Sequence, residues 1–225
     1  MLSLSPQMTG SSRNSTLETR SPGGLEVARM KIPFYFDYAC PWAYLGSCRV
    51  ESYFQDLAVE IDFKPVRLAD LVEVKGPKGL PAAERKKKWY VDDLRAWAEM
   101  VGGELAPLNP DKTRPDTKLL LQAALVAQDC GKFREYHYPA YRARWAEGKA
   151  VDEPATVKSL LESAGLGDAE LEDAQSDALA KRLATDTEAA VRRGVFGVPT
   201  LFVGDRMFWG NDRFELVRHF IEKSA

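Results

Sequence analysis

The stretch FYFDYACPWAYLGS, residues 34–47, passes from an apolar strand into a helix at a cysteine and a proline. Residues 32–36 are apolar and aromatic, which is typical of a buried strand, and Pro41 suits the first position of a helix over about residues 41–55. Residues 59–66 alternate as a second strand does. Strand, helix and strand in this order predict the opening of a parallel α/β sheet.

Outward from this opening the chain becomes helical and then returns to strands. Apolar side chains recur at helical spacing between about residues 82 and 193, where we expect helices and no strand. Residues 198–203 and 206–209 read as a hairpin. A closing helix then takes Asn211 or Asp212 as its N-cap.

These patterns predict an α/β fold in three parts. Residues 1–29 are rich in Ser, Gly, Thr and Arg, and we expect a disordered tail that lacks the apolar run of a secretory signal. Residues 30–80 and 194–225 form the sheet domain. Residues 81–193 form a large all-helical insertion domain.

Composition narrows the classes of function. The net charge is -2 over 225 residues, whereas a general nucleic-acid binder is basic, so we expect no nucleic-acid partner. No apolar run approaches the roughly 20 residues that cross a bilayer, so we expect no membrane insertion. An odd number of cysteines and two isolated histidines predict neither a disulfide framework nor a metal site. We expect a cytoplasmic location, where thiols stay reduced.

Cys40 is the candidate catalytic residue. A thiol at a helix N-terminus faces free backbone N–H groups and the positive end of the helix dipole. Both favour the thiolate, so we expect a lowered pKa for the Cys40 thiol. The alternative is that Cys40 is only a small buried apolar residue.

Val198 and Pro199 are the second candidate feature. Proline is disfavoured at the start of a central strand because it has no N–H to donate to the ladder. A cis bond would aim the backbone of Val198 at a ligand, whereas a trans proline at the first strand residue would need no function. Spacing alone does not separate these alternatives.

Together these elements look like the thioredoxin superfamily, and the helical insertion resembles its DsbA-like branch. Residues 34–47 resemble the opening of 2-hydroxychromene-2-carboxylate isomerases and kappa-class glutathione transferases. WYVDDLRAWAEMVG (89–102) and GVFGVPTLFVGDRMFWGNDR (194–213) are similar to segments of the isomerases. The likeness covers about residues 30–225. It implies a thioredoxin-like sheet domain, glutathione as cofactor, a small aromatic substrate and a homodimer.

The resemblance also assigns roles to residues. The family usually has a serine at the helix N-terminus, where its hydroxyl stabilises the glutathione thiolate, and Cys40 stands at that position. The resemblance implies a cis-proline at Pro199, opposite Cys40. The cysteinyl backbone of glutathione is expected against Val198, the residue before it, with Pro199 shaping the turn. The γ-glutamyl end is expected at the start of the last helix, on Trp209, Gly210, Asn211 and Asp212.

The chain departs from the family pattern at three places. Cys40 replaces the serine, Ala43 stands where redox-active DsbA-like proteins have a second cysteine, and Gly76-Pro77-Lys78 lacks an asparagine that kappa-like relatives offer to glutathione. The function predicted is a glutathione-dependent isomerase of an aromatic-degradation intermediate. The alternatives are a monothiol DsbA-like thiol–disulfide oxidoreductase, a kappa-like glutathione transferase using Cys40, and a binding domain without turnover.

Overall fold

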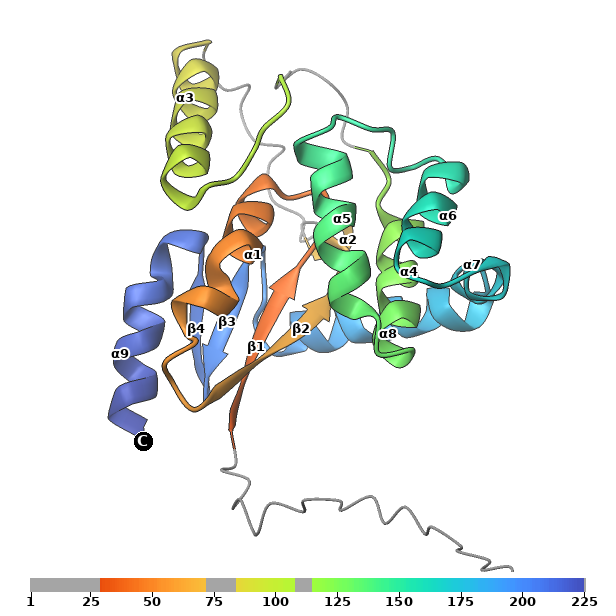
Figure 1. Ribbon diagram of the computed structural model, residues 1–225. Helices are drawn as coiled ribbons and strands as arrows, with labels where there is room; N and C mark the ends of the chain where they lie inside the picture. The colour runs from red at the N-terminus through yellow and green to blue at the C-terminus, as the bar shows by residue number, and fades with distance from the viewer. Residues whose placement is uncertain (1–28, 72–83, 108–114, 225) are drawn as a thin grey trace, which may run out of the picture.

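A mixed sheet forms the centre of the protein. The computed structural model describes residues 29–71, 84–107 and 115–224, except for the side chains of residues 84–88. The four strands lie in the order β2-β1-β3-β4 (Figure 1). Their bounds are β1 (Met30–Phe36), β2 (Val59–Pro65), β3 (Thr200–Val203) and β4 (Arg206–Trp209).

The strand directions bring one set of chain ends to one edge of the sheet. β1 and β2 are parallel, and β3 is antiparallel to β1, with Phe34 opposite Leu201. β4 is antiparallel to β3, with Thr200 opposite Trp209. The end of β1, the start of β3 and the end of β4 therefore lie together at the same edge.

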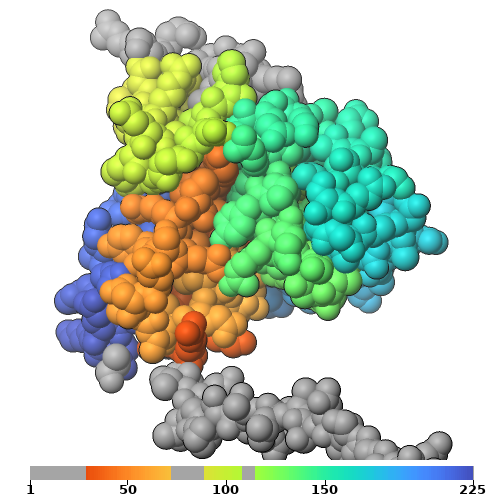
Figure 2. All heavy atoms as spheres, in the orientation of Figure 1, coloured from red at the N-terminus to blue at the C-terminus, as the bar shows by residue number. Residues whose placement is uncertain are grey.

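Helices make up most of the remainder of the described chain. α1 (Pro41–Tyr53) connects β1 to β2, and η1 (Asn211–Arg213), a 3₁₀ turn, leads into the closing helix α9 (Phe214–Ser224). Between β2 and β3 lie α2 (Leu68–Leu71), α3 (Glu84–Val101), α4 (Lys118–Asp129), α5 (Phe133–Trp145), α6 (Pro154–Ser163), α7 (Asp168–Ala174) and α8 (Asp177–Arg192). Helices α4 to α7, in green and cyan, gather on one side of the molecule (Figure 2). None of the described helices is long and apolar enough to cross a membrane.

The expected order of strands and helices is confirmed, with differences at the ends of elements. Sequence reasoning missed α2 and α7, which have four and seven residues and are too short to show a helical period. β3 begins at Thr200 instead of Val198, because Pro199 has no N–H for the ladder. The division into domains at residues 80/81 and 193/194 stays a prediction.

The predicted N-cap of the closing helix is wrong. Gly210 caps η1, and no side chain provides a capping hydrogen bond there. Asn211 is buried within η1, and α9 itself begins at Phe214. Asn and Asp are favoured as N-cap residues, but neither the Asn211 nor the Asp212 side chain caps a helix here.

Gly46 lets α1 approach the end of the sheet. A Cβ on Gly46 would lie 3.4 Å from Phe34 Cζ, 3.5 Å from Pro199 Cγ and 3.6 Å from Asn211 Cβ. These are ordinary contacts, so a methyl group fits, whereas a longer side chain would push the three segments apart.

Substitutions at Gly46 should therefore separate by size. Gly46→Ala is expected to raise the free energy of unfolding by up to about 1 kcal/mol, because alanine favours a helix interior. Gly46→Leu is expected to lower it by about 1–3 kcal/mol through overpacking. Urea unfolding of both variants measures the two changes. A Gly46→Leu protein as stable as Gly46→Ala would contradict the close approach.

Candidate functional site

Cys40 stands where a loop turns into a helix. It is the N-cap residue of α1 with extended backbone angles, and Pro41 follows it at the first helical position. The Cys40 N–H donates to the carbonyl of Asp37 at 3.1 Å, and the Cys40 carbonyl accepts the first helical bond from Tyr44 at 3.1 Å. The side chain of Cys40 is 6% exposed. Its backbone and its position are those expected; its ionisation stays a prediction.

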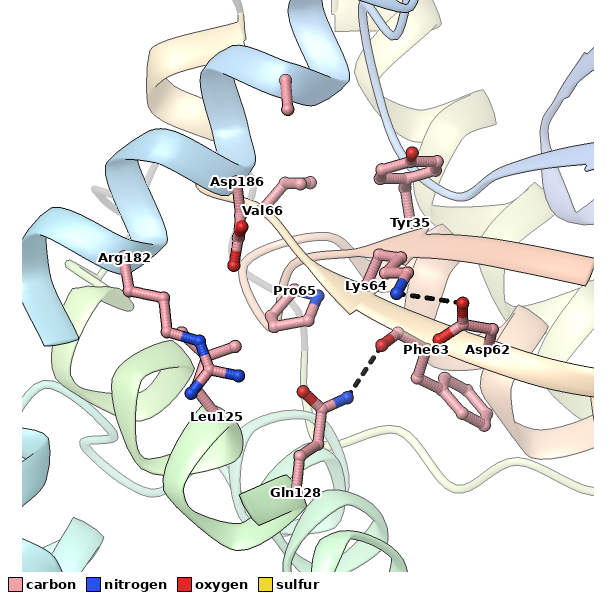
Figure 3. Close-up of a pocket in the computed structure, with 11 residues that line it drawn as sticks. Tyr35, Asp62, Phe63, Lys64, Pro65, Val66, Leu125, Gln128, Arg182 and Asp186 are labelled. Carbon is pink, nitrogen blue, oxygen red and sulfur yellow. Dashed lines mark hydrogen bonds and ion pairs between the residues drawn. The ribbon is translucent and has the colours of Figure 1, made fainter.

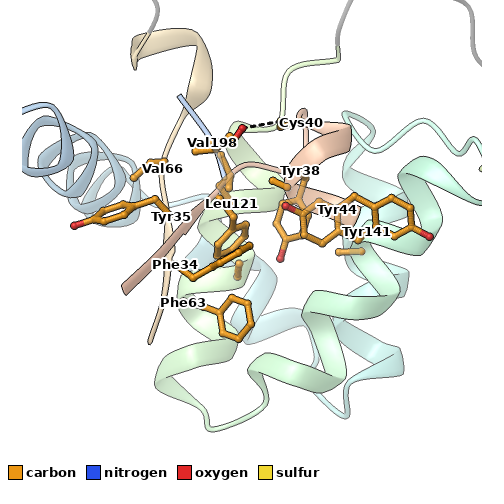
Figure 4. Packing of buried hydrophobic residues seen from close by; sticks show 14 of the residues in the cluster. Phe34, Tyr35, Tyr38, Cys40, Tyr44, Phe63, Val66, Leu121, Tyr141 and Val198 are labelled. Carbon is orange, nitrogen blue, oxygen red and sulfur yellow. Dashed lines mark hydrogen bonds between the residues drawn. The ribbon is translucent and has the colours of Figure 1, made fainter. Parts of the chain in front are cut away.

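Cys40 meets the loop before β3. The peptide bond between Val198 and Pro199 is cis. Cys40 Sγ donates to the carbonyl oxygen of Val198 at 3.1 Å, across 158 residues of sequence (Figure 4). This hydrogen bond needs a protonated sulfur. The two features that sequence reasoning singled out therefore face each other at one edge of the sheet.

The end of β4 joins the same place. The N–H of Gly210 donates to the carbonyl of Pro199 at 2.9 Å. The Trp209 indole lies against Gly197, where a Cβ would come 2.9 Å from Nε1, and against the ring of Phe196 at 5.1 Å. Trp209 is 53% exposed, so one face of this aromatic pair is open to solvent.

Asn211 is buried at this edge with a donor unused. It is 4% exposed, and its Nδ2 has no hydrogen-bond partner among the described residues. Its carbonyl accepts from Arg49 of α1 at 2.7 Å. The Arg49 guanidinium lies 4.5 Å from the ring centre of Phe214, and burial lowers the pKa of Arg49. A buried amide without an acceptor is costly unless a ligand or water supplies one.

The structure thus brings together all seven residues proposed as site residues from the sequence, although Cys40 lies 158 or more residues before the other six. Asp212 is exposed and pairs with Arg213 at 3.5 Å. The other two cysteines, Cys48 and Cys130, are free and exposed. The described residues contain no group of three or more His, Cys, Asp or Glu side chains placed to hold a metal ion. The loop Gly76-Pro77-Lys78 lies outside the described residues.

Sequence reasoning missed the buried polar groups that contact the loop between β1 and Cys40. Asp37 is 1% exposed, and burial raises the pKa of its carboxyl group. His137 is fully buried, shares a 3.1 Å hydrogen bond with the hydroxyl of Tyr38, and has its pKa lowered by burial to about 3. The one available signal was an aspartate at a strand-to-helix loop, where such residues often bind nearby N–H groups.

A separate pocket lies between β2, α4 and α8 (Figure 3). Its volume is about 520 Å³, and none of the predicted site residues lines it. Its charged lining groups are largely paired: Lys64 with Asp62 at 2.9 Å, and Arg182 with Asp129 outside the lining. The chemistry of Cys40 therefore lies elsewhere.

Comparison with known proteins identifies the relatives of this chain. Residues 31–222 match the family model of the DSBA-like thioredoxin domain. The chain is 31% identical to 2-hydroxychromene-2-carboxylate isomerase of Pseudomonas sp. (strain C18) over 201 residues. The aligned part covers 88% of this chain and 92% of the relative. It is 33% identical over 188 residues to the enzyme of that name from Pseudomonas putida, covering 82% and 90%.

Solved structures agree with these sequence relatives. A structure of 2-hydroxychromene-2-carboxylate isomerase superposes with a TM-score of 0.71 and 30% identity, covering 86% of this chain and 95% of the other. The α/β fold with a helical insertion is accordingly a DsbA-like thioredoxin fold. The chain belongs to the DsbA-like thioredoxin-domain family, in the group of the 2-hydroxychromene-2-carboxylate isomerases.

Proposed function

We propose that this protein is a glutathione-dependent isomerase of the 2-hydroxychromene-2-carboxylate isomerase type, acting on an intermediate of aromatic degradation. The observation that carries the proposal is the 3.1 Å contact between Cys40 Sγ and the carbonyl oxygen of Val198. It places a hydrogen-bond donor at a helix N-terminus beside the main chain that the family uses for the cysteinyl part of glutathione. We also propose a cytoplasmic location and a homodimer. Sedimentation equilibrium would test the oligomeric state.

The residues at this edge suit glutathione. The main chain of Val198 would pair with the cysteinyl backbone, and Trp209 would provide an apolar wall. The γ-glutamyl carboxylate would accept from the N–H groups at the start of η1 and from Asn211, whose buried Nδ2 lacks an acceptor among the described residues. The exposed carboxylate of Asp212 would bind the γ-glutamyl ammonium group.

When bound, glutathione supplies a thiolate that adds reversibly to the conjugated acid, so that a carbon–carbon bond can rotate before elimination. Cys40 would donate its S–H to that negative charge instead of to Val198, as the family's serine donates its hydroxyl. The start of α1 adds the positive end of the helix dipole. The reaction transfers no net electrons, so it needs no second cysteine, in agreement with Ala43 in α1.

Replacing the Cys40 sulfur by oxygen should preserve the activity. Cys40→Ser keeps a donor at the helix N-terminus, and we expect isomerisation within about threefold of the wild type, since either neutral donor can make the hydrogen bond to the thiolate. Cys40→Ala removes the donor and should slow the reaction by about tenfold or more, the effect of losing a bond to a charged group. The assay follows the absorbance of a 2-hydroxychromene-2-carboxylate in the presence of glutathione.

The other cysteine of α1 provides the control. Cys48 is free and exposed, so Cys48→Ser should leave the rate unchanged. A large loss in Cys40→Ser, together with the mass of one glutathione on wild-type Cys40, would overturn the isomerase proposal in favour of the monothiol oxidoreductase. If the protein binds glutathione but converts neither the chromene nor a halogenated aromatic compound, it is a binding domain and not an enzyme of either type.

A further inference from the structure

Asp37 is a buried carboxylate that the proposed chemistry does not use. Its Oδ1 accepts from the N–H of Ala39 at 2.8 Å and from the hydroxyl of Thr117 at 2.7 Å, and its Oδ2 accepts from the N–H of Leu68 at 2.7 Å. The three donors belong to the Cys40 loop, to the first residue of α2 and to the residue before α4. One side chain therefore joins three segments that are distant in sequence.

The main chain of Asp37 fixes the same loop from the other side. Its carbonyl accepts from the N–H of Cys40 at 3.1 Å and from the hydroxyl of Tyr141 at 3.1 Å. The next residue is held as well, because the indole of Trp145 donates to the carbonyl of Tyr38 at 3.0 Å. The loop that ends in Cys40 thus has few free backbone groups.

Stability alone is a poor explanation for a carboxylate at this position. Asp37 is 1% exposed, and the three groups that donate to its side chain are all neutral. Nearby Arg67 favours the charge on Asp37, but its guanidinium binds Asp70 at 2.6 Å and Asp116 at 3.3 Å and makes no direct ion pair with Asp37 among the described contacts. A charge buried without a paired cation costs free energy, which an apolar residue of similar shape would avoid.

We propose that Asp37 is a positioning residue for Cys40: its carboxylate, held by Thr117 and Leu68, sets the sulfur of Cys40 against the carbonyl of Val198. The proposal rests on the proposed function only in taking Cys40 as the working group. It predicts that the hydroxyl of Thr117, which never touches Cys40, controls how well the sulfur is held.

Thr117→Val tests this step, and the chain provides a matched control. Thr117 and Thr187 are both 3% exposed, and the hydroxyl of each is hydrogen-bonded. Thr187 accepts from the N–H of Arg67, just before α2, at 3.1 Å and donates to the carbonyl of Leu183 at 2.8 Å. Each Thr→Val change removes one buried hydroxyl at nearly constant volume. Only the hydroxyl of Thr117 binds Asp37.

The readout is the rate at which iodoacetamide alkylates Cys40 in the folded full-length protein, resolved by peptide mass spectrometry and divided by the rate at exposed Cys130. Thr117→Val should raise this ratio about tenfold, because the loop loses a charge-assisted hydrogen bond. Thr187→Val should leave it within about twofold, and Thr117→Ser, which restores the hydroxyl, should return it to the wild-type value. Urea unfolding identifies conditions in which all variants are folded.

Several outcomes would overturn the positioning role. Equal ratios in Thr117→Val and Thr187→Val would mean general loosening, and an unchanged ratio in Thr117→Val would mean that the loop is held without Asp37. Failure of Thr117→Ser to restore the ratio would mean that the shape of the side chain, and not its hydroxyl, controls the ratio. The alkylation assay uses neither glutathione nor a chromene, so its result stands apart from success or failure of the isomerase assay.

Discussion

Between pH 7 and pH 4 the free energy of unfolding should fall by about 3 kcal/mol because of one buried imidazole, that of His137. Burial lowers its pKa from 6.5 to about 3. Below pH 6.5 the unfolded chain takes up a proton at His137 while the folded protein does not, so acid favours unfolding. The penalty is absent above the unfolded pKa, grows as the pH falls, and reaches about 2 kcal/mol by pH 5.

The surroundings of His137 explain the size of this effect. Its ring is stacked on Phe133 at 4.5 Å and meets the edge of Phe36 at 4.7 Å, so a charged imidazolium would lose its hydration. Its Nδ1 shares a hydrogen bond with Tyr38, and its Nε2 lies 3.4 Å from the hydroxyl of Ser47. The nearby guanidinium of Arg134 also disfavours the proton.

The test compares the two histidines of the chain. His137→Asn keeps an acceptor near the Nδ1 position but has no group that titrates, and urea unfolding at pH 7 and pH 5 measures its stability. Truncation of the ring costs stability at both pH values, so the difference between them isolates the proton. That difference should shrink by about 2 kcal/mol in His137→Asn and stay as in the wild type in His219→Asn, whose histidine is exposed. An unshrunken difference in His137→Asn would refute the assignment.

The strand–helix–strand opening could be predicted from the sequence because its signals are local. Pro41 marks the start of α1 within the chain itself, and the alternation over residues 59–66 requires no knowledge of distant residues. The facing of Cys40 and Val198 required one further step, the family resemblance, since spacing left the isomer of the Val198–Pro199 bond open. The cis bond in the structure agrees with what that resemblance implied.

The buried polar contacts could not be predicted in the same way. The bond between Thr117 and Asp37 spans 80 residues, and that between Tyr38 and His137 spans 99. No periodic pattern marks such pairs, because each depends on how α4 and α5 pack on the loop before α1. The predicted N-cap role of Asn211 is wrong for a related reason. Asparagine favours a helix cap, but close packing of η1 against α1 at Gly46 buries the Asn211 side chain instead.

Gly210→Ala should lower both the stability of the protein and its affinity for glutathione. Gly210 has a φ of 116° and a ψ of 149°, a backbone region that residues other than glycine rarely adopt. An added Cβ would also overlap Oδ1 of Asp212. The strain costs about 1–3 kcal/mol, and the only inexpensive relief is to rotate the Asp212 carboxylate away from its place. That rotation removes the partner that we propose for the γ-glutamyl ammonium group.

Urea unfolding and calorimetric titration with glutathione measure the two effects, and Gly204 at the other end of β4 is the matched control. Gly204 has a φ of 57° and no neighbour within 4 Å of an added Cβ, so Gly204→Ala should cost about 1–2 kcal/mol of stability and leave the Kd unchanged. Gly210→Ala should weaken the Kd by about tenfold, which corresponds to about 1.4 kcal/mol. If Gly210→Ala loses stability but keeps its Kd, glutathione does not use Asp212. If both variants lose affinity alike, the loss reflects general destabilisation, and the proposed γ-glutamyl site at the start of η1 is wrong.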